Sequence, residues 1–377
     1  MVSSRDGLGE EFFSEQGDTI WISEPLVLVL WITMHYPNLN LKRTLVWDKV
    51  LISKLQQSLI ESASSDREIL VLVGCTTQVP EKTPSLDDFY RQLALFMAVQ
   101  PHIHVYPTRE EWEWESGKLG DLRLFQEIAN SFKAAGKDWL SYFPKTCDGI
   151  GRCKLPPPGT GMNVEGGDKM VVKPICSSGG KGVRVVSVTE RQGLKCVLSQ
   201  QRRQNIDPQK HMFHQEYIET LSTLGEFRVV IVRDTSPDAI SAGKIVYIVL
   251  TRPRNSFREQ VTRRFHNGDF FAGIISDKDV QDRKYRELVE YCLKIYQELF
   301  KRRHNPGLSS IEMGVRLDVG LSKASAEGCF FVLEATRLFT ASTYGEGSCT
   351  QACKEWSYAA GFVLGRWIEE CVRSRQA

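Results

Sequence analysis

Hydrophobic residues in the first 146 positions fall into short runs that alternate between two spacings. Continuous apolar runs are typical of buried strands, whereas apolar residues at every third or fourth position are typical of helices. The predicted strands are 25–34, 68–74 and 102–107, and the predicted helices are 46–63, 86–100 and 120–136. Strands that alternate with helices indicate βαβ units and a parallel sheet, so we expect an α/β domain over 1–146. The fingerprint G-x-G-x-x-G does not follow the first strand, so a dinucleotide cofactor is not expected.

A stretch rich in glycine and proline, 147–168, separates this domain from a different pattern. Such composition is typical of linkers and loops. Beyond it, two strands joined by a glycine turn, a helix near 190–204 and further strands predict a small α+β domain over 169–222. The remainder, 223–377, combines strands with two long helices, the first predicted at 279–303, and forms the last predicted division.

Composition and charge exclude several classes of function. The 377 residues include 48 Lys and Arg against 46 Asp and Glu, so no strong positive field would attract nucleic acid or an anionic membrane. The longest apolar run near the N-terminus is too short to span a bilayer, and the acidic residues before it do not suit a signal peptide. Ten scattered cysteines indicate reduced thiols and a cytoplasmic protein. Cys349 and Cys353 lie one helical turn apart, but nothing nearby completes a zinc site.

The stretch 173–183, KPICSSGGKGV, places one lysine in an apolar strand and another among glycines. It matches neither the P-loop nor the glycine-rich loop of kinases. Small residues between two strands still allow backbone N–H groups to approach a phosphate chain, and Lys173 would add a positive charge. The alternative is a tight hairpin whose second lysine, Lys181, is solvated.

The segment that ends the next strand is a candidate for adenine binding. Gln215, Glu216, Tyr217 and Ile218 end an apolar strand whose unpaired backbone could read the edge of a base. Glu219, just beyond them, could accept hydrogen bonds from ribose hydroxyls.

Two sets of charged residues follow. Glu226 and Arg228 alternate along one strand and therefore share a face, although an exposed ion pair is an equally simple interpretation. Arg252, Arg254 and Arg258 could hold an anionic substrate, because guanidinium groups match carboxylates, or could form a solvated strand end.

Asp318 and Glu334 are each carried by a strand-like run. If these strands pair, both carboxylates could project from one sheet face. Two carboxylates above a phosphate chain would suit Mg²⁺, which prefers hard oxygen ligands. The alternative is that each acid pairs with a nearby arginine, such as Arg316 or Arg337.

Taken in order, these motifs resemble those of the ATP-grasp superfamily over about 144–343. The shared plan is a strand ending in Lys-Pro, a Ser/Gly loop, a QEYI hinge, an acid-x-Arg strand, an Asp strand and a Glu strand. The resemblance implies an ATP-grasp fold with α/β and α+β parts, preceded by a Rossmann-like pre-ATP-grasp domain.

The resemblance also implies roles for individual residues. The implied ATP-binding residues are Lys118, Lys173, Ser177, Ser178, Gly179, Gly180, Gly182, Gln215, Glu216, Tyr217, Ile218 and Glu219. The implied catalytic residues are Lys173 and Arg228, the implied ligands of Mg²⁺, or alternatively Mn²⁺, are Asp318, Glu334 and Thr336, and the implied substrate contacts are Arg252, Arg254 and Arg337. Thr336 is a departure, because many members have asparagine at that position.

A ligase is the function that the resemblance implies. It would join a small-molecule carboxylate, for example an amino acid, to an amine or another nucleophile through an acylphosphate, releasing ADP and phosphate. An ATP-grasp small-molecule kinase is one alternative, and a catalytically degenerate nucleotide-binding protein, suggested by Thr336, is the other. The candidate oligomeric state is a homodimer. No motif in the sequence identifies the carboxylate or the nucleophile.

Overall fold

The computed structural model describes part of the chain, in two compact units. The described residues are 13–16, 19–22, 51–63, 69–73, 86–100, 102–116, 118–147, 169–175, 182–187, 204, 211–234, 242–254, 259–264, 267–337, 361–362 and 365–366. The first unit comprises 1–109, 338–343 and 350–377, and the second comprises 110–337 and 344–349. No helix in the described part is both long and apolar enough to cross a membrane.

The described residues of the first unit include a βαβ unit. Strands β3 (Ile69–Leu72) and β4 (Ile103–Tyr106) pair in parallel, and helix α3 (Leu86–Val99) connects them. Helix α2 (Leu51–Ala63) precedes β3, and β1 (Phe13–Gln16) and β2 (Thr19–Ile22) form an antiparallel pair that the hydrophobic pattern did not predict. The predicted strand 25–34 lies outside the described residues, so the complete Rossmann-like domain stays a prediction.

The second unit begins earlier in the chain than predicted. Helix α5 (Lys118–Ala134) follows α4 (Arg109–Ser116), and its residues Leu124, Phe125 and Ile128 lie in the core of the second unit. Residues 110–146 therefore belong to the unit of the strands that follow them, whereas the sequence pattern had assigned them to the domain 1–146. Cys147, the first residue of the predicted linker, is part of strand β5.

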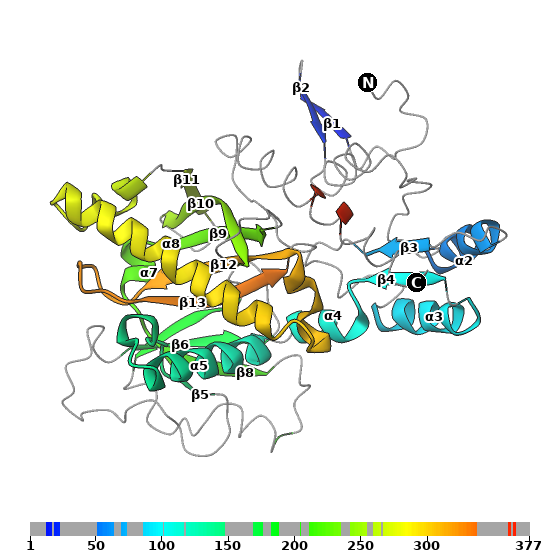
Figure 1. Ribbon diagram of the computed structural model, residues 1–377, viewed down its shortest axis with the longest axis horizontal. Coiled ribbons are helices and arrows are strands. Elements are labelled where there is room, and N and C mark those ends of the chain that lie inside the picture. Colours follow the sequence, from blue (N-terminus) through cyan, green and yellow to red (C-terminus); the bar gives the residue numbers. More distant parts are fainter. Residues whose placement is uncertain are drawn as a thin grey trace. The chain divides into compact units, whose positions relative to one another are not determined.

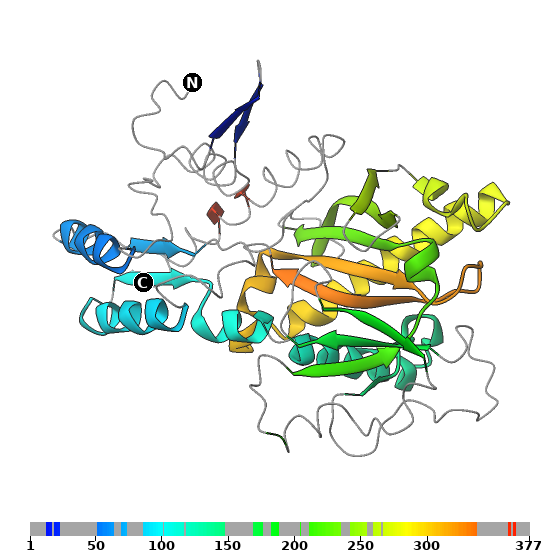
Figure 2. The same ribbon diagram turned by 180° about the vertical axis from the view of Figure 1, so that it is seen from behind.

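A five-stranded antiparallel sheet forms the centre of the second unit. Its order is β11-β10-β9-β12-β13. The bounds are β9 (Glu226–Arg233), β10 (Gly243–Arg254), β11 (Glu259–Arg264), β12 (Gly314–Leu321) and β13 (Phe330–Arg337). Figures 1 and 2 show helix α8 (Lys278–Lys301) lying across one face of this sheet. Short helices connect these elements: α7 (Thr220–Thr223) and the 3₁₀ helices η2 (Asp138–Leu140), η4 (Asn267–Phe271) and η5 (Pro306–Glu312).

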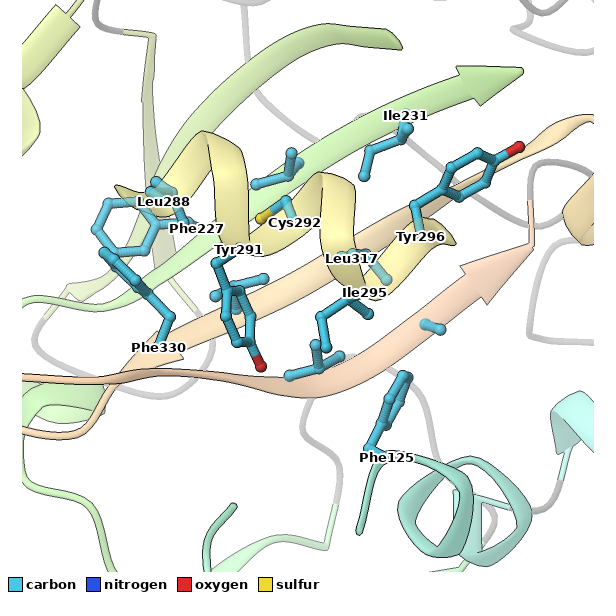
Figure 3. Packing of buried hydrophobic residues seen from close by; sticks show 14 of the residues in the cluster. Phe125, Phe227, Ile231, Leu288, Tyr291, Cys292, Ile295, Tyr296, Leu317 and Phe330 are labelled. Atoms are coloured by element: carbon cyan, nitrogen blue, oxygen red, sulfur yellow. The ribbon is translucent and has the colours of Figure 1, made fainter. Parts of the chain in front are cut away.

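Helix α8 follows from its sequence. The Asp277 carboxylate accepts a hydrogen bond from the Val280 N–H at 3.0 Å and caps the helix. Its buried residues recur at helical spacing, and Leu288, Cys292 and Ile295 face the sheet. Figure 3 shows these side chains against residues from the facing strands, so this interface forms the main core of the unit.

The second unit also contains a sheet of four strands. Its order is β5-β8-β6-β7, with β5 (Thr146–Cys147), β6 (Lys169–Pro174), β7 (Arg184–Ser187) and β8 (Met212–Glu216) all antiparallel to their neighbours. Leu122 of α5 packs with Cys147 and Phe213, so α5 covers one face of this sheet, as Figure 2 also shows from behind. The predicted division at 222 falls inside α7, between β8 and β9, and stays a prediction.

One buried ion-pair network attaches α5 to the end of β13. The Arg337 side chain is wholly buried and donates to both Asp121 carboxylate oxygens at 3.0 Å. Its Nε lies 3.8 Å from the Glu111 carboxylate, which in turn accepts from the Ser310 N–H at 2.9 Å and from the Ser310 hydroxyl. Arg337 Nη2 also donates to the Gly307 carbonyl at 3.3 Å. Each buried charge here has a partner, which is the condition for keeping it charged.

Arg337→Met should destabilise the protein strongly. Methionine keeps most of the apolar volume but leaves the Asp121 and Glu111 carboxylates buried without their cation, which typically costs about 3–5 kcal/mol. Urea unfolding followed by circular dichroism measures the change. Arg286→Met, at an exposed position of α8, is the matched control and should change stability by less than about 0.5 kcal/mol. Equal unfolding midpoints for the two variants would contradict this prediction.

Candidate functional site

A row of polar residues crosses three strands of the five-stranded sheet. In register, Arg228 of β9 lies opposite Asp318 of β12, and Asp318 lies opposite Glu334 of β13. Arg316 and Thr336 form the neighbouring cross-strand pair. The residues between them along each strand belong to the core that α8 covers. Because side chains alternate along a strand, these five residues lie on the opposite face of the sheet.

A β-bulge in β13 places Glu334 on this face. Pairing passes from Asp318–Glu334 to Val319–Val332, so Leu333 is an extra residue in β13. Val332 belongs to the core, and in a regular strand Glu334 would lie on the same side as Val332. The extra residue reverses the alternation and brings the Glu334 carboxylate beside Asp318.

The charges on this face are paired with one another. Arg316 forms a bidentate interaction with Asp318, with Nε 2.8 Å from Oδ1 and Nη2 3.0 Å from Oδ2. Arg228 donates to Glu226 from Nη2 at 2.8 Å, and its Nε lies 3.9 Å from the Asp318 carboxylate. The prediction that Glu226 and Arg228 share a face is confirmed by their contact. The predicted alternative of an Arg316–Asp318 pair is also present.

Burial and neighbouring charges shift the pKa values of two members of this group. Burial raises the pKa of the Glu226 carboxyl, the Asp318 charge raises it further, and the Arg228 guanidinium opposes both effects. For Arg316, burial would lower the pKa, but the Asp318 carboxylate, with Glu334 and Glu226, raises it above its usual value. Arg316 therefore remains a permanent cation beneath the surface of the site.

A second set of contacts orients Lys173, which lies near the end of strand β6. Its Nζ donates to Gln215 Oε1 at 2.9 Å, and Gln215 Nε2 donates to Thr146 Oγ1 at 2.8 Å. The Thr146 hydroxyl donates in turn to the Pro144 carbonyl at 2.9 Å. This chain of hydrogen bonds fixes the amide of Gln215, so that its oxygen faces the ammonium.

The pKa of the Lys173 ammonium is affected by burial and by charged neighbours of both signs. Burial lowers its pKa to about 8, and the nearby Lys118 contributes in the same direction. Glu334 and Glu226 oppose the shift. Lys173 of one sheet is thus electrostatically coupled to the acidic residues of the other sheet.

Lys118 is the first residue of α5, and its backbone N–H donates to the Ile175 carbonyl at 3.3 Å. This bond holds the start of the helix against the end of β6. The positive end of a helix favours anions, and here it lies with two lysine side chains. Lys118 and Lys173 lie close enough to interact, and their binding of one ligand stays a prediction.

The predicted adenine segment has mixed surroundings. The Glu216 carboxylate accepts a hydrogen bond from the Lys145 N–H at 3.0 Å. This bond links the end of β8 to the residue that precedes β5. Tyr217 is half-buried, Ile218 is buried and Glu219 is exposed. Their contacts with a nucleotide stay a prediction.

Part of the predicted loop cannot be placed. Ser177, Ser178, Gly179 and Gly180 lie outside the described residues. Gly182, at its end, has φ of 77°, and a Cβ there would lie 2.9 Å from the Pro174 ring. Only glycine fits this position without strain.

The predicted substrate contacts have different outcomes. Arg252 and Arg254 lie in the end of β10, opposite Val261 and Glu259 of β11, and their substrate role stays a prediction. Arg337, in contrast, is fully occupied with Asp121 inside the protein. We therefore assign Arg337 to the ion-pair network instead of to a substrate.

Hard oxygen ligands for a divalent cation are present on the charged face. The carboxylates of Asp318 and Glu334 lie on directly opposed positions of β12 and β13. Within the described part of the chain, no hydrogen bond reaches the Glu334 carboxylate, and no three His, Cys, Asp or Glu side chains gather closely enough to hold a metal alone. Two carboxylates that need further oxygen ligands fit Mg²⁺, which usually takes those ligands from phosphates and water.

Two residues that the sequence analysis named make contacts in the site that it did not assign to them. Arg316 was considered only as a partner that would neutralise Asp318, and Gln215 only as a neighbour of adenine. The spacing Arg-x-Asp, two residues apart on a strand, was the available signal for Arg316, because it places both side chains on one face. No local signal links Gln215 to Lys173, which is 42 residues away in the chain.

Comparisons with known proteins give a likeness to solved structures. No protein-family model matches the chain, and no curated protein matches it. A D-cycloserine synthetase structure is 14% identical over 85% of this chain and 98% of its own, with a TM-score of 0.37. D-alanine–D-alanine ligase from Bacillus anthracis is 13% identical over 94% of this chain and 96% of its own, with a TM-score of 0.43. The same ligase complexed with ATP is 14% identical over the same shares, also with a TM-score of 0.43.

Because the TM-scores are below 0.5, the function proposed below rests on the arrangement of the charged residues instead.

Gln215→Leu should lower the pKa of Lys173 below its value of about 8, because the Gln215 oxygen stabilises the charged ammonium and leucine cannot. NMR titration of ¹³C-methylated lysines, with Lys173 assigned by substitution, measures this pKa. Gln126→Leu, at a half-buried position of α5, is the control and should leave it unchanged. The same Lys173 pKa in wild type and Gln215→Leu would mean that this hydrogen bond does not act on the ammonium.

Proposed function

We propose that the charged face binds ATP and that the chain is an ATP-dependent ligase, joining a carboxylate to an amine or another nucleophile. The observation that carries this proposal is that Lys173 interacts with Lys118 on one side and with Glu334 and Glu226 on the other. Asp318 lies beside the same two acids, opposite Glu334 and within the field of Glu226. Cations suit a polyphosphate, and carboxylates suit the divalent ion that accompanies it. Few other ligands call for both in one place.

The lysines would neutralise the phosphate chain. Lys173, held by Gln215, offers a fixed point charge, and the start of α5 adds Lys118 and the positive end of a helix. The glycine-rich loop before Gly182 would cover the phosphates and keep water away from an acylphosphate. Ile218 and its neighbours at the end of β8 would line the adenine.

Magnesium would be held by Asp318 and Glu334, and it would neutralise charge on the phosphates. Arg228 and Arg316 stand beside these carboxylates and would face the carboxylate substrate or the phosphoryl group being transferred. Guanidinium groups suit this task, because they bind planar oxygen pairs and stay charged at any working pH.

The proposed reaction has two steps. An oxygen of the substrate carboxylate attacks the γ-phosphorus, the bond to the β-phosphate oxygen breaks, and ADP leaves with that electron pair. The nucleophile then attacks the acyl carbon, the bond to the phosphate oxygen breaks, and inorganic phosphate leaves while the amine loses a proton. The residues of the site contribute position and charge neutralisation, which are the main requirements of phosphoryl transfer.

Lys173→Met should weaken ATP binding about 10- to 100-fold, because a charge-assisted hydrogen bond to phosphate is lost. Calorimetry with ATP and Mg²⁺ measures the affinity, and thermal unfolding shows that the variant is folded. Lys244→Met removes an exposed lysine from β10 of the same unit and should leave the affinity unchanged. Unaltered affinity in Lys173→Met would remove the central assignment of the proposal.

A screen of amino acids and other carboxylates, alone and with amines, should identify the reaction. A ligase releases inorganic phosphate only when both substrates are present, and Glu334→Gln should abolish that release. Phosphate that stays on an organic product would identify a kinase instead. Failure of ATP to bind at any magnesium concentration would exclude both enzymes.

A further inference from the structure

Thr336 lies at the position where the ATP-grasp plan expects a third metal ligand, and its hydroxyl is already engaged. Arg316 Nη2 donates to Thr336 Oγ1 at 3.0 Å across the two strands. The same nitrogen donates to Asp318 Oδ2, also at 3.0 Å. One guanidinium nitrogen therefore lies between the threonine hydroxyl and the aspartate carboxylate.

A metal ion bound by both oxygens would compete with this nitrogen. Mg²⁺ binds its oxygen ligands at about 2.0–2.1 Å in nearly octahedral geometry. An ion within that distance of both Thr336 Oγ1 and Asp318 Oδ2 would occupy the region that the Arg316 nitrogen fills. It would also place two cations in contact, because Arg316 is a buried guanidinium and guanidinium groups stay charged at any working pH.

The carboxylates of Asp318 and Glu334 can bind a metal ion without displacing Arg316. Asp318 retains lone pairs that Arg316 does not use, because each carboxylate oxygen has two. Glu334 accepts no hydrogen bond within the described part of the chain and lies directly opposite Asp318. A cation held by Asp318 and Glu334 needs no displacement of Arg316, provided that it takes its remaining ligands from phosphate and water.

We propose that Thr336 is a positioning residue for Arg316 and is not a metal ligand. This inference rests on the proposed function, and it assigns metal binding to Asp318 and Glu334 alone. The Thr336 hydroxyl on β13 and the Asp318 carboxylate on β12 both accept hydrogen bonds from the Arg316 guanidinium. These two contacts fix the guanidinium in one orientation above the sheet. Arg316 is thereby presented to an anionic group of the substrate in a single orientation.

Three variants of Thr336 separate the two roles. Thr336→Val has nearly the same shape but no acceptor, Thr336→Ser keeps the acceptor, and Thr336→Asn offers the amide oxygen that a third ligand would supply. Two measurements are made on the full chain. The first is the affinity for Mn²⁺ in the presence of a non-hydrolysable ATP analogue, by electron paramagnetic resonance, and the second is the rotation of the Arg316 guanidinium, by ¹⁵N NMR.

The expected result is that Thr336→Val binds Mn²⁺ within about two-fold of wild type, whereas Asp318→Asn and Glu334→Gln bind it at least about ten-fold more weakly. In Thr336→Val the Arg316 guanidinium should rotate faster, and Thr336→Ser should restore the slow rotation. Thr336→Asn should not tighten Mn²⁺ binding.

Mn²⁺ binding weakened by Thr336→Val as much as by Glu334→Gln would overturn the proposal, as would unchanged guanidinium rotation. If Asp318→Asn and Glu334→Gln also left Mn²⁺ binding unchanged, the metal site of the proposed function would be wrong. In that case the rotation measurement alone would decide the role of Thr336.

Discussion

The arrangement of the second unit depends on the pairing of Arg316 with Asp318. The two residues lie on a strand whose other face is the fully buried core, and both are themselves largely shielded from water. A charge in such a place is stable only if an opposite charge and hydrogen bonds accompany it. This pair allows a sheet to carry a densely charged face directly behind its hydrophobic one.

The two sheets are tied together through charges as well as through packing. Arg337 anchors α5 to β13 by its ion pair with Asp121, and the start of that helix carries Lys118 toward Lys173. The same strand that ends in Arg337 supplies Glu334 to the site. This buried ion pair thus joins the helix that carries Lys118 to the strand that carries Glu334.

Much of this could be predicted from the sequence, because hydrophobic spacing identified helix α8 and strands β6, β9, β12 and β13. The shared face of Glu226 and Arg228 followed from strand alternation. Partners from distant segments could not be predicted: Gln215 for Lys173, Asp121 for Arg337, and the membership of α5 in the second unit. Local pattern describes what a segment buries, whereas these pairings depend on which segments the fold brings together.

The bulge at Leu333 shows that a strand's length in residues can itself be a functional property. On its early side, β13 turns Val332 to the core, and after the extra residue it turns Ala335 there instead. The strand thus changes the phase of its alternation at the point where the site begins. An insertion or deletion of a single residue between Phe330 and Glu334 would exchange the apolar and charged faces of the strand beyond it. This segment should therefore tolerate changes of side chain far more readily than changes of length.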